Sequence, residues 1–325
     1  MHTLEKVYEN AIFQALNPEG KQWMTAAWLP KQPGSIAAKY DIKIAALFTF
    51  GVFPHIKTVP TVRMMLEDVK DERYVGKHTI VIDSSGNTGH AVARLARAFG
   101  FEHVKVVVAL DVPQSKKSIL SALSSAEVIH PSGKQSVAER AVEEGQKPGH
   151  YHLNQYGHWG NVRAHELYTG PEIVRLLGDD IGVIAVAMGS GGTVTGVGNF
   201  FRQHRAGPIV LGVRPAEGER VPGARDRKRM EDVVRFPWRR AVDAVVEVDR
   251  KASFIRTREL WSLVNPQAGP TSGLALAGLE KYLESFEEEA LDRIFRGTTV
   301  GFICPDDGRF YSESIITELD TDQGI

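Results

Sequence analysis

The sequence predicts an α/β protein with two doubly wound domains built on parallel sheets. From about residue 78 onward, short apolar runs rich in β-branched residues alternate with amphipathic segments of helical period. The apolar runs are bounded by Gly, Pro or Asp, as is typical of strands buried on both faces. Strands separated by helices in this order indicate parallel sheets covered by helices. The length of 325 residues is enough for roughly two such domains.

The elements follow from this alternation in chain order. The expected strands are the apolar runs at 79–83, 104–110, 127–130, 182–188, 208–213, 243–248 and 299–304. The expected helices have a 3.6-residue apolar period and lie near 88–99, 115–124, 136–144, 162–177, 194–204, 255–264, 272–285 and 287–295. The segment QYGHWGN interrupts the alternation with Gly and aromatic residues, which predicts a domain boundary around 155–162.

Composition excludes several classes of protein. The 39 basic and 40 acidic residues give a formal charge of -1, so nothing favours a nucleic-acid surface or an anionic membrane. The longest uncharged apolar stretch, Ile44–Phe53, is well short of the roughly 20 residues of a spanning helix. The N-terminal MHTLEKVYENAIF carries charges and lacks the apolar core of a signal peptide. One cysteine, Cys304, excludes a disulfide framework. We therefore expect a soluble, cytoplasmic protein.

The sharpest motif is SSGNTG at 84–89, which directly follows the strand TIVID and opens a helix. Free backbone N–H groups at a helix N-terminus, together with the helix dipole, form a site for a carboxylate or phosphate. Ser, Asn and Thr are also ordinary helix caps, but a cap needs one such residue and this run has four. We therefore predict a binding loop here.

A second glycine-rich turn, GSGGTVTG at 189–196, again lies between an apolar strand and a helix. Its glycines permit tight turns and close approach, so that successive N–H groups can converge on a phosphate. Val194 stands where a dinucleotide fingerprint needs its third glycine, and no Gly-Lys-Ser/Thr follows as in a Walker loop. The pattern favours phosphate binding without nucleotide machinery.

Lys57 is the single formally charged residue between Lys43 and Arg63. Apolar surroundings disfavour the ammonium form, which lowers the lysine pKa and frees the amine for Schiff-base chemistry. A lysine extending from the edge of a core has the same sequence signature, so this signal is weak by itself.

Other motifs favour no site of their own. GPTSG at 269–273 resembles a nucleophile elbow but has Thr at its centre and no His-Asp partners in order. His150, His152 and His158 lack a convincing set of carboxylate partners, so we expect no metal. Cys304 is expected to be a buried structural thiol. The arginine-rich segment 217–240 is expected to be a solvated loop, with binding of an anionic substrate group as the alternative.

A Schiff-base lysine, a phosphate loop and a carboxylate-binding turn are together what pyridoxal 5'-phosphate and an amino acid require. In this order they resemble the fold-type II pyridoxal-phosphate enzymes, specifically the cysteine synthase and cystathionine β-synthase family, with its tryptophan synthase β-like fold. SSGNTG resembles the family's asparagine loop, GSGGTVTG its phosphate loop and NQY at 154–156 its Asn-Gln-Phe segment. RAHELYTGPEIVRLLG, GPTSG and CPDDGRFY match further blocks, so the resemblance covers residues 42–312.

The resemblance implies a role for each matching residue. Lys57 would hold the cofactor as an internal aldimine, and Asn87 would hydrogen-bond its 3-oxygen. The cofactor phosphate would be held by Gly189, Ser190, Gly191, Gly192, Thr193 and Thr195. The substrate carboxylate would be bound by Ser84, Ser85, Thr88 and Gln155. Thr271 would face the pyridine nitrogen with a neutral hydroxyl, which leaves that nitrogen unprotonated and favours β-elimination over transamination.

The resemblance also implies the organisation and the reaction. A smaller, mobile domain at 42–160 would carry the asparagine loop, and a larger cofactor-binding domain would comprise 1–41 and 161–325, in a homodimer. The reaction would be β-replacement: an activated L-serine (O-acetyl- or O-phosphoserine) loses its leaving group to give an aminoacrylate, to which a second substrate, a thiol, sulfide or amine, adds. Asn-Thr-Gly at 87–89, in place of the dehydratases' Asn-His-Ala, favours this synthase branch.

Two departures from the family leave alternatives open. The lysine context is PHIKTV, and the usual N-terminal Gly-Asn-Thr-Pro-Leu block is missing. A β-elimination lyase or dehydratase that releases pyruvate and ammonia is one alternative. A catalytically silent binding homologue is the other, because the altered context surrounds the residue that chemistry requires. His55, His158 and the segment 217–240 are candidates for selecting the nucleophile.

Overall fold

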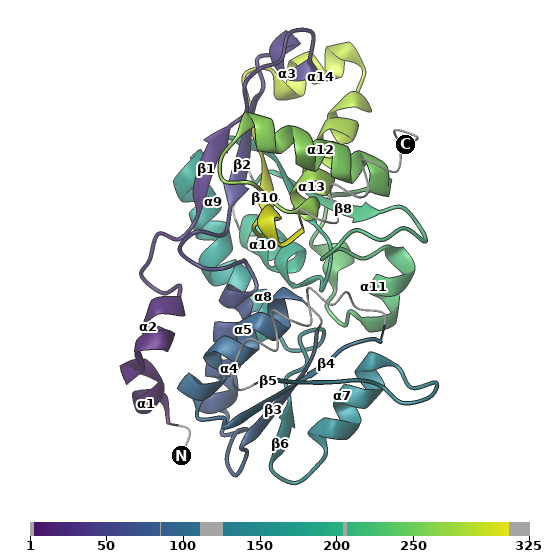
Figure 1. Ribbon diagram of the computed structural model, residues 1–325. Coiled ribbons are helices and arrows are strands. Elements are labelled where there is room, and N and C mark those ends of the chain that lie inside the picture. Colours follow the sequence, from purple (N-terminus) through teal and green to yellow (C-terminus); the bar gives the residue numbers. More distant parts are fainter. Residues whose placement is uncertain (1–2, 85, 111–125, 204–206, 312–325) are drawn as a thin grey trace. The chain divides into compact units, whose positions relative to one another are not determined.

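The chain forms two sheets that belong to two separate compact units (Figure 1). The computed structural model describes residues 3–84, 86–110, 126–203 and 207–311. The first unit comprises the described residues of Met1–Glu19 and Lys57–Ala164, and the second those of Gly20–Ile56 and His165–Ile325. Within the described ranges, no helix combines the length and apolar character needed to cross a bilayer.

The first unit is built on a four-stranded parallel sheet in the order β5-β4-β3-β6. Its strands are β3 (Thr79–Asp83), β4 (His103–Val107), β5 (Ala126–Ile129) and β6 (His150–His152). All five residues of β3 are buried, as expected of a central strand covered on both faces. In Figure 1, α7 lies on one side of this sheet, and α4 and α5 lie on the other.

The helices of the first unit are α1 (Leu4–Glu9), α2 (Ala11–Leu16), α4 (Thr58–Lys70), α5 (Asn87–Leu95), η1 (Ala96–Phe99), α7 (Val137–Gly145) and α8 (Gly160–Ala164). Helix α4 buries ten of its thirteen residues, so it is a core helix rather than a surface one. Helix α7 begins with a capping box, in which Ser136 and Glu139 each hydrogen-bond the other's backbone amide.

The second unit has a six-stranded sheet in the order β1-β2-β10-β7-β8-β9, in which β1 alone runs antiparallel to its neighbour. Its strands are β1 (Thr25–Trp28), β2 (Lys43–Phe48), β7 (Ile181–Ala187), β8 (Ile209–Pro215), β9 (Ala244–Val248) and β10 (Thr299–Cys304). The β1–β2 pair places an antiparallel strand at the edge, a common ending for parallel sheets.

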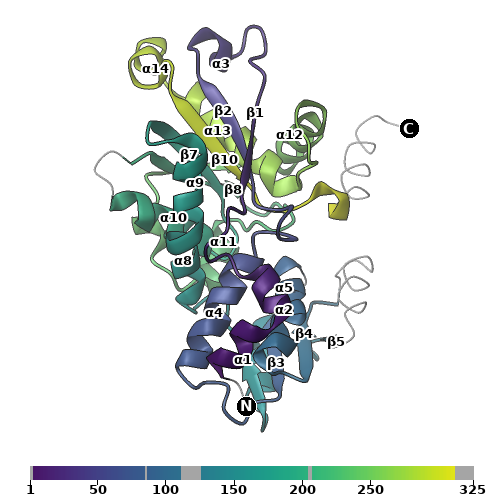
Figure 2. The same cartoon turned by 90° about the vertical axis from the view of Figure 1, so that its left-hand side faces the viewer.

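Figure 2 shows α9 and α10 on one side of this sheet and α12 and α13 on the other. The helical elements of the unit are α3 (Ile36–Lys39), η2 (His165–Thr169, a π turn), α9 (Gly170–Leu177), α10 (Gly192–Arg202), α11 (Arg227–Val233), η3 (Trp238–Arg240), α12 (Arg250–Leu263), α13 (Pro270–Glu284), α14 (Glu288–Phe295) and η4 (Gly308–Tyr311). Leu274, Leu276 and Leu279 of α13 are buried in an apolar cluster with Leu211 and Phe302 of the sheet. That cluster is the core of this unit.

The fold class predicted from the sequence is confirmed, and each expected strand is present within a few residues of its predicted position. Three strands were not expected. Strand β2 (Lys43–Phe48) overlaps the apolar stretch Ile44–Phe53; it was missed because neither flanking helix was expected, α3 being only four residues long and α4 rich in β-branched residues. Strands β1 and β6 are only four and three residues long.

The expected helices correspond to α5 with η1, α7, α8 through α9, α10, α12, α13 and α14. The expected helix at 115–124 lies outside the described residues. Helix α4 was missed because Val59, Thr61 and Val62 have low helix propensity and because apolar residues occupy most of its circumference. Helix α11 was hidden by its five charged residues.

The division into units differs from the expected one at 42–160. Residues 42–56 belong to the second unit because β2 pairs in parallel with β10. The N-terminal helices belong to the first unit, where Phe13 of α2 packs edge-on against Phe99, with ring centroids 5.6 Å apart. Sequence alone shows neither pairing, because both join segments far apart in the chain. The mobility of the smaller domain stays a prediction.

Candidate active site

Lys57 immediately precedes α4 and is half-buried. Its backbone carbonyl accepts hydrogen bonds from the amide (3.2 Å) and the hydroxyl (2.7 Å) of Thr61, which fix the first turn of the helix. Pro60 is tolerated in this turn because its missing N–H has no intrahelical partner there. The positive end of the helix dipole disfavours a second positive charge beside it. This placement suits the reactive amine predicted from the sequence.

The asparagine loop also ends in a helix N-terminus. Gly86 is the N-cap of α5 and has no side chain with which to cap it, and Asn87 and Thr88 are the first two residues of the helix. The Gly86 amide donates to Ser84 Oγ at 3.4 Å. Ser85 lies outside the described residues. The N-cap glycine has no side chain to shield this helix N-terminus, and a helix N-terminus of this kind suits an anion.

Two predicted carboxylate ligands, Thr88 and Gln155, are brought together by the fold. Thr88 Oγ1 donates to Gln155 Oε1 at 2.8 Å, and Gln155 Nε2 donates to the carbonyl of Asp83 at 3.3 Å. Both side chains are buried, and they are 67 residues apart in sequence. Asn161 Nδ2 donates to the Gln155 carbonyl at 2.7 Å. The asparagine loop and the Gln155 loop thus form one hydrogen-bonded unit.

The glycine loop connects β7 to α10 in the second unit. Gly191 adopts φ +79°, a left-handed conformation that favours glycine. A Cβ at Gly189 would lie 2.4 Å from the carbonyl oxygen of Gly223, and one at Gly191 would lie 2.7 Å from Val234 Cγ1. The backbone is therefore packed too closely for side chains at either position. These glycines are required by the geometry of the loop itself.

The loop's threonines have internal partners. Thr193 Oγ1 lies 3.2 Å from His165 Nε2, and His165 Nδ1 lies 2.8 Å from Thr169 Oγ1. Thr195 donates both its amide (3.0 Å) and its hydroxyl (2.6 Å) to the carbonyl of Gly191. Thr195 thus stabilises the first turn of α10, and its role toward a phosphate stays a prediction. His165 was not singled out from the sequence, where it is one polar residue in a helical pattern.

The arginine-rich segment packs against the glycine loop. The Arg225 amide donates to the carbonyl of Met188, the residue before the loop, at 2.9 Å. The segment contains α11 and η3, and its apolar residues Met230, Phe236 and Trp238 are buried. The expected solvated loop is wrong for these residues, because the segment supplies one wall of the glycine loop.

Thr271, in the first turn of α13, lies close to Gly223 of the same arginine-rich segment. A Cβ at Gly223 would lie 3.2 Å from Thr271 Cγ2. Thr271 is 3% exposed, and its hydroxyl has no hydrogen-bond partner in the part of the chain that the structure describes. Burying a hydroxyl without a partner costs about 1–3 kcal/mol. The position is therefore suited to a ligand that offers a hydrogen-bond partner.

These features fit pyridoxal phosphate, the cofactor that the resemblance implies. The glycine loop has no space for side chains at Gly189 and Gly191, so backbone rather than side chains would contact a ligand there. The N-terminus of α10 that follows the loop suits a phosphate. The unsatisfied Thr271 hydroxyl in the same unit suits a neutral ring nitrogen.

The remaining candidates have structural partners. His150, His152 and His158 face three different carboxylates, Glu144, Asp83 and Asp68, rather than one shared point. Among the residues that the structure describes, no group of three or more metal-ligating side chains is suited to hold an ion.

Cys304 is fully buried in β10, as expected. Burial raises the pKa of its thiol to about 12, which makes it unreactive.

Comparison with known proteins agrees with the fold. A family model described as pyridoxal-phosphate dependent enzyme matches residues 56–304. The chain is 24% identical to cysteine synthase B of Escherichia coli (strain K12) over 326 residues, covering 100% of this chain and 99% of that protein. It is 28% identical to cystathionine beta-synthase of Dictyostelium discoideum over 235 residues, covering 66% and 46%.

Among solved structures, O-ureido-L-serine synthase has a TM-score of 0.79 at 20% identity and 95% coverage of both chains. Cysteine synthase of Entamoeba histolytica has a TM-score of 0.74 at 22% identity and 92% coverage of both chains. These two likenesses concern the fold. Since the family model covers most of the sequence, the chain belongs to the pyridoxal-phosphate-dependent enzymes, in the fold-type II group related to cysteine synthase and cystathionine β-synthase.

Proposed function

We propose that the protein catalyses β-replacement on an activated L-serine, such as O-acetyl- or O-phosphoserine, with a thiol, sulfide or amine as the second substrate. The observation that carries this proposal is the buried Thr271 hydroxyl without a partner. A hydroxyl is too weak an acid to protonate a ring nitrogen, since its pKa is far above that of a carboxylic acid. Chemistry that needs only removal of the α-proton and loss of a β-substituent is therefore favoured over transamination.

Each part of the proposed site would have its own role in binding or in proton transfer. When bound, pyridoxal phosphate supplies stabilisation of negative charge at the substrate α-carbon. Lys57 Nζ would hold the cofactor and move the α-proton. The glycine loop with Ser190, Gly192 and Thr193 would hold the phosphate, and Asn87 would bind the ring's 3-oxygen.

The substrate carboxylate would be bound at the N-terminus of α5. The N-cap of that helix, Gly86, has no side chain to block an anion, and Thr88 and Gln155 are hydrogen-bonded to each other in the same loop region. Ser84 completes this set, and Ser85 is proposed from the resemblance alone. The buried Thr88–Gln155 pair would fix the orientation of the substrate, which positions its α-proton for transfer.

The first experiment is the visible absorption spectrum of the purified protein, before and after adding O-acetylserine. The wild type is expected to show the band of lysine-bound cofactor and a shift with substrate. Lys57→Ala is expected to lose the wild-type band, whereas Lys70→Ala, at the exposed end of the same helix, should retain it. A wild type that stays colourless when pyridoxal phosphate is added would refute the proposal.

The choice between replacement and net elimination depends on the second substrate. Replacement predicts that turnover requires an added sulfide, thiol or amine. Release of pyruvate and ammonia at full rate without a second substrate would instead establish a lyase. Substrate binding without exchange of the α-proton for solvent deuterium would establish a silent homologue.

We also propose, from the resemblance, that the protein is a homodimer located in the cytoplasm. Analytical ultracentrifugation of the purified holoenzyme tests the dimer, which a mass near 36 kDa would contradict. Cell fractionation tests the location.

A further inference from the structure

The loop that carries Gln155 contains no strand or helix of its own between residues 154 and 159. On one side, the Leu153 amide donates to the carbonyl of Val81 at 2.9 Å, which continues the pairing of β6 with β3. On the other side, Asn161 in α8 holds the Gln155 carbonyl. Within the loop, the amides of Gly157 and His158 donate to the carbonyl of Asn154 at 3.3 and 3.0 Å and form a turn. The backbone thus shapes the turn, and side chains attach the turn to helix α4.

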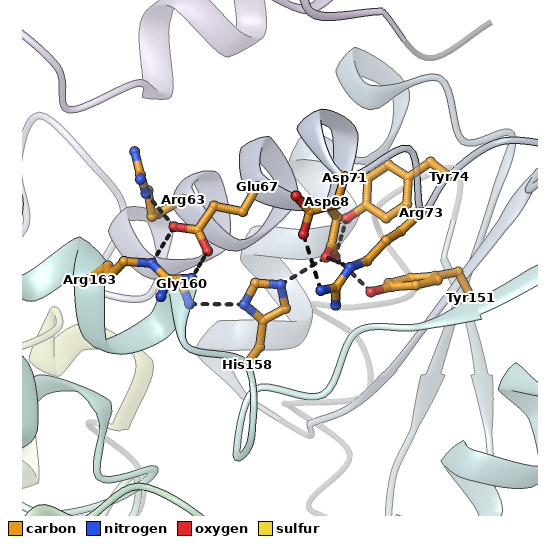
Figure 3. Close-up of polar contacts among 10 residues, drawn as sticks. All are labelled: Arg63, Glu67, Asp68, Asp71, Arg73, Tyr74, Tyr151, His158, Gly160 and Arg163. Carbon is orange, nitrogen blue, oxygen red and sulfur yellow. Dashed lines mark hydrogen bonds and ion pairs between the residues drawn. The ribbon is translucent and has the colours of Figure 1, made fainter.

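His158 closes this loop with both of its ring nitrogens (Figure 3). Nδ1 lies 3.0 Å from the backbone nitrogen of Gly160, and Nε2 lies 2.9 Å from Asp68 Oδ1. Because a backbone N–H can only donate, Nδ1 accepts and the ring proton is on Nε2, which donates to the carboxylate. The side chain is only 10% exposed. Both the orientation and the tautomer of this ring are fixed by its partners.

Asp68 is a rigid anchor for His158. Its carboxylate is fully buried and accepts hydrogen bonds from the hydroxyls of Tyr74 (3.1 Å) and Tyr151 (2.8 Å), with Arg73 Nε 3.5 Å away (Figure 3). Burial and the neighbouring Asp68 raise the pKa of Tyr151, so its hydroxyl remains a donor. A buried carboxylate with this many donors has little freedom to move.

A second set of contacts ties the far end of the loop to the same helix. Glu67 of α4 accepts from Arg63 Nε on its own helix and from Arg163 Nε on α8, each at 2.7 Å. Burial would raise the pKa of Glu67, but the two arginines outweigh it and lower that pKa. A Cβ at Gly160 would lie 2.9 Å from Met64 Cα, so α8 packs directly on α4. The loop is therefore held at two adjacent positions of α4.

We propose that His158 is a positioning residue, which holds the Gln155 side chain in place by fixing its loop to Asp68. The inference rests on the proposed function, in which Gln155 and Thr88 bind the substrate carboxylate. His158 acts through Gln155 and not by contact with the substrate. Histidine suits this place because it donates to a carboxylate and accepts from a backbone amide at the same time.

Helix α4 also begins directly after Lys57, so the anchor of the Gln155 loop and the proposed catalytic lysine share one helix. Asp68 lies about three turns after that lysine. A single rigid element thus sets two parts of the proposed site. Loosening the His158 contact releases one of them and leaves the other in place.

The experiment separates the two bonds of His158 in the holoenzyme. In His158→Gln the amide nitrogen lies near the Nε2 position and can still donate to Asp68. In His158→Asn the amide oxygen lies near the Nδ1 position and can still accept from Gly160. His158→Leu removes both bonds. Tyr74→Phe is the matched control, because it removes one hydrogen bond to Asp68 at a site away from the loop.

The readout is the affinity for two small amines that differ by one carboxylate, glycine and methylamine, measured from the change in cofactor absorption. His158→Leu is expected to weaken glycine binding on the order of 10- to 100-fold while methylamine binding is unchanged. His158→Gln and His158→Asn are expected to restore part of the glycine affinity. Tyr74→Phe leaves the His158–Asp68 bond and the Tyr151 bond in place, so it is expected to lower the melting temperature and to weaken glycine binding far less than His158→Leu does.

Two results would overturn the inference. The first is unchanged glycine affinity in all three His158 variants, or equal losses for glycine and methylamine, which would indicate a merely structural role. The second is wild-type glycine affinity in Gln155→Ala, which would show that Gln155 does not bind the carboxylate. That second result refutes this part of the proposed function as well, whereas the first leaves the proposed function intact.

Discussion

The asparagine loop and the glycine loop both join the end of a buried parallel strand to a helix N-terminus, but they are built differently. In the asparagine loop, side chains define the surface, and Thr88 is held by a hydrogen bond to Gln155 from another segment. In the glycine loop, the backbone defines the surface, and neighbouring atoms leave no space for a Cβ at Gly189 or Gly191. A loop built from side chains can change its ligand by substitution, whereas a loop built from backbone tolerates little change.

This comparison predicts its largest effect at Gly189. In Gly189→Ala the new methyl group meets the Gly223 carbonyl oxygen, a backbone atom that cannot move aside. Overpacking of this kind costs about 1–3 kcal/mol, so we expect pyridoxal phosphate affinity to fall roughly 10- to 100-fold. Titration of the apoprotein by absorbance measures it. Gly86→Ala is the counterpart in the other loop, where no atom lies within 4 Å, and it should affect cofactor affinity less. Equal losses in both variants would contradict the distinction.

The next effect concerns the side-chain loop. Thr88→Val deletes the hydroxyl that donates to Gln155 and leaves a buried acceptor unsatisfied, at a cost of about 1–3 kcal/mol. We expect glycine affinity to fall about tenfold, with cofactor affinity little changed. Thr88→Ser keeps the hydroxyl and should bind glycine nearly as the wild type does. If Thr88→Ser loses as much affinity as Thr88→Val, the hydroxyl is not what matters.

A smaller effect is expected at Thr271, where one substitution should change apoprotein stability and cofactor affinity in opposite directions. Thr271→Val replaces an unpartnered buried hydroxyl by a methyl group of similar size, so the apoprotein should melt at the same or a higher temperature. The same variant should bind pyridoxal phosphate more weakly, by about a factor of ten for one lost hydrogen bond. Differential scanning calorimetry and absorbance titration measure the two quantities. A less stable apoprotein would show that the hydroxyl has a partner in the free protein.

The smallest effect concerns the sheet beneath the asparagine loop. The buried Glu144 of α7 pairs with Lys105 of β4 at 2.8 Å and with Lys147 at 2.7 Å. Burial would raise its pKa, but these lysines outweigh burial and lower the pKa to about 2. Because the folded pKa is depressed, this stabilisation is complete above the unfolded pKa of about 4.3 and is lost as the pH falls toward 2.

We therefore expect Glu144→Gln to lower the melting temperature at pH 7 by roughly 2–4 °C, and the difference from the wild type to shrink at pH 3. Thermal unfolding followed by circular dichroism at both pH values checks this expectation. A difference that is the same at pH 7 and pH 3 would mean that the Glu144 charge contributes nothing to stability.

The sequence predicted the elements whose contacts join residues close together in the chain. It did not predict the contacts that join distant segments. The turn from β3 into α5 was predicted because small polar residues directly follow an apolar run. Thr88 and Gln155 were both predicted to bind the substrate carboxylate. Their hydrogen bond to each other was not predicted, since 67 residues separate them. The partner of His158 could not be predicted at all, because Asp68 lies 90 residues away in a helix whose β-branched residues concealed it.

The same reasoning explains the arginine-rich segment. Its charge indicated a solvated loop, but its apolar residues are buried, and Val234 and Phe236 lie within 4 Å of a Cβ built at Gly191 of the glycine loop. Val234, Phe236 and Trp238 recur at every second residue, an apolar period that the eight basic residues of the segment obscured. A charged stretch should therefore be examined for apolar periodicity before it is assigned to solvent.

The unpartnered hydroxyl of Thr271 also bears on the history of the sequence. A buried polar group that stabilises nothing by itself is retained only while a ligand uses it. A lineage that stopped binding at this place would gain stability by exchanging Thr for Val or Ala, and drift would soon make that exchange. Among relatives of the chain, Thr at this position should therefore mark proteins that bind a ligand there, and Val or Ala should mark proteins that do not.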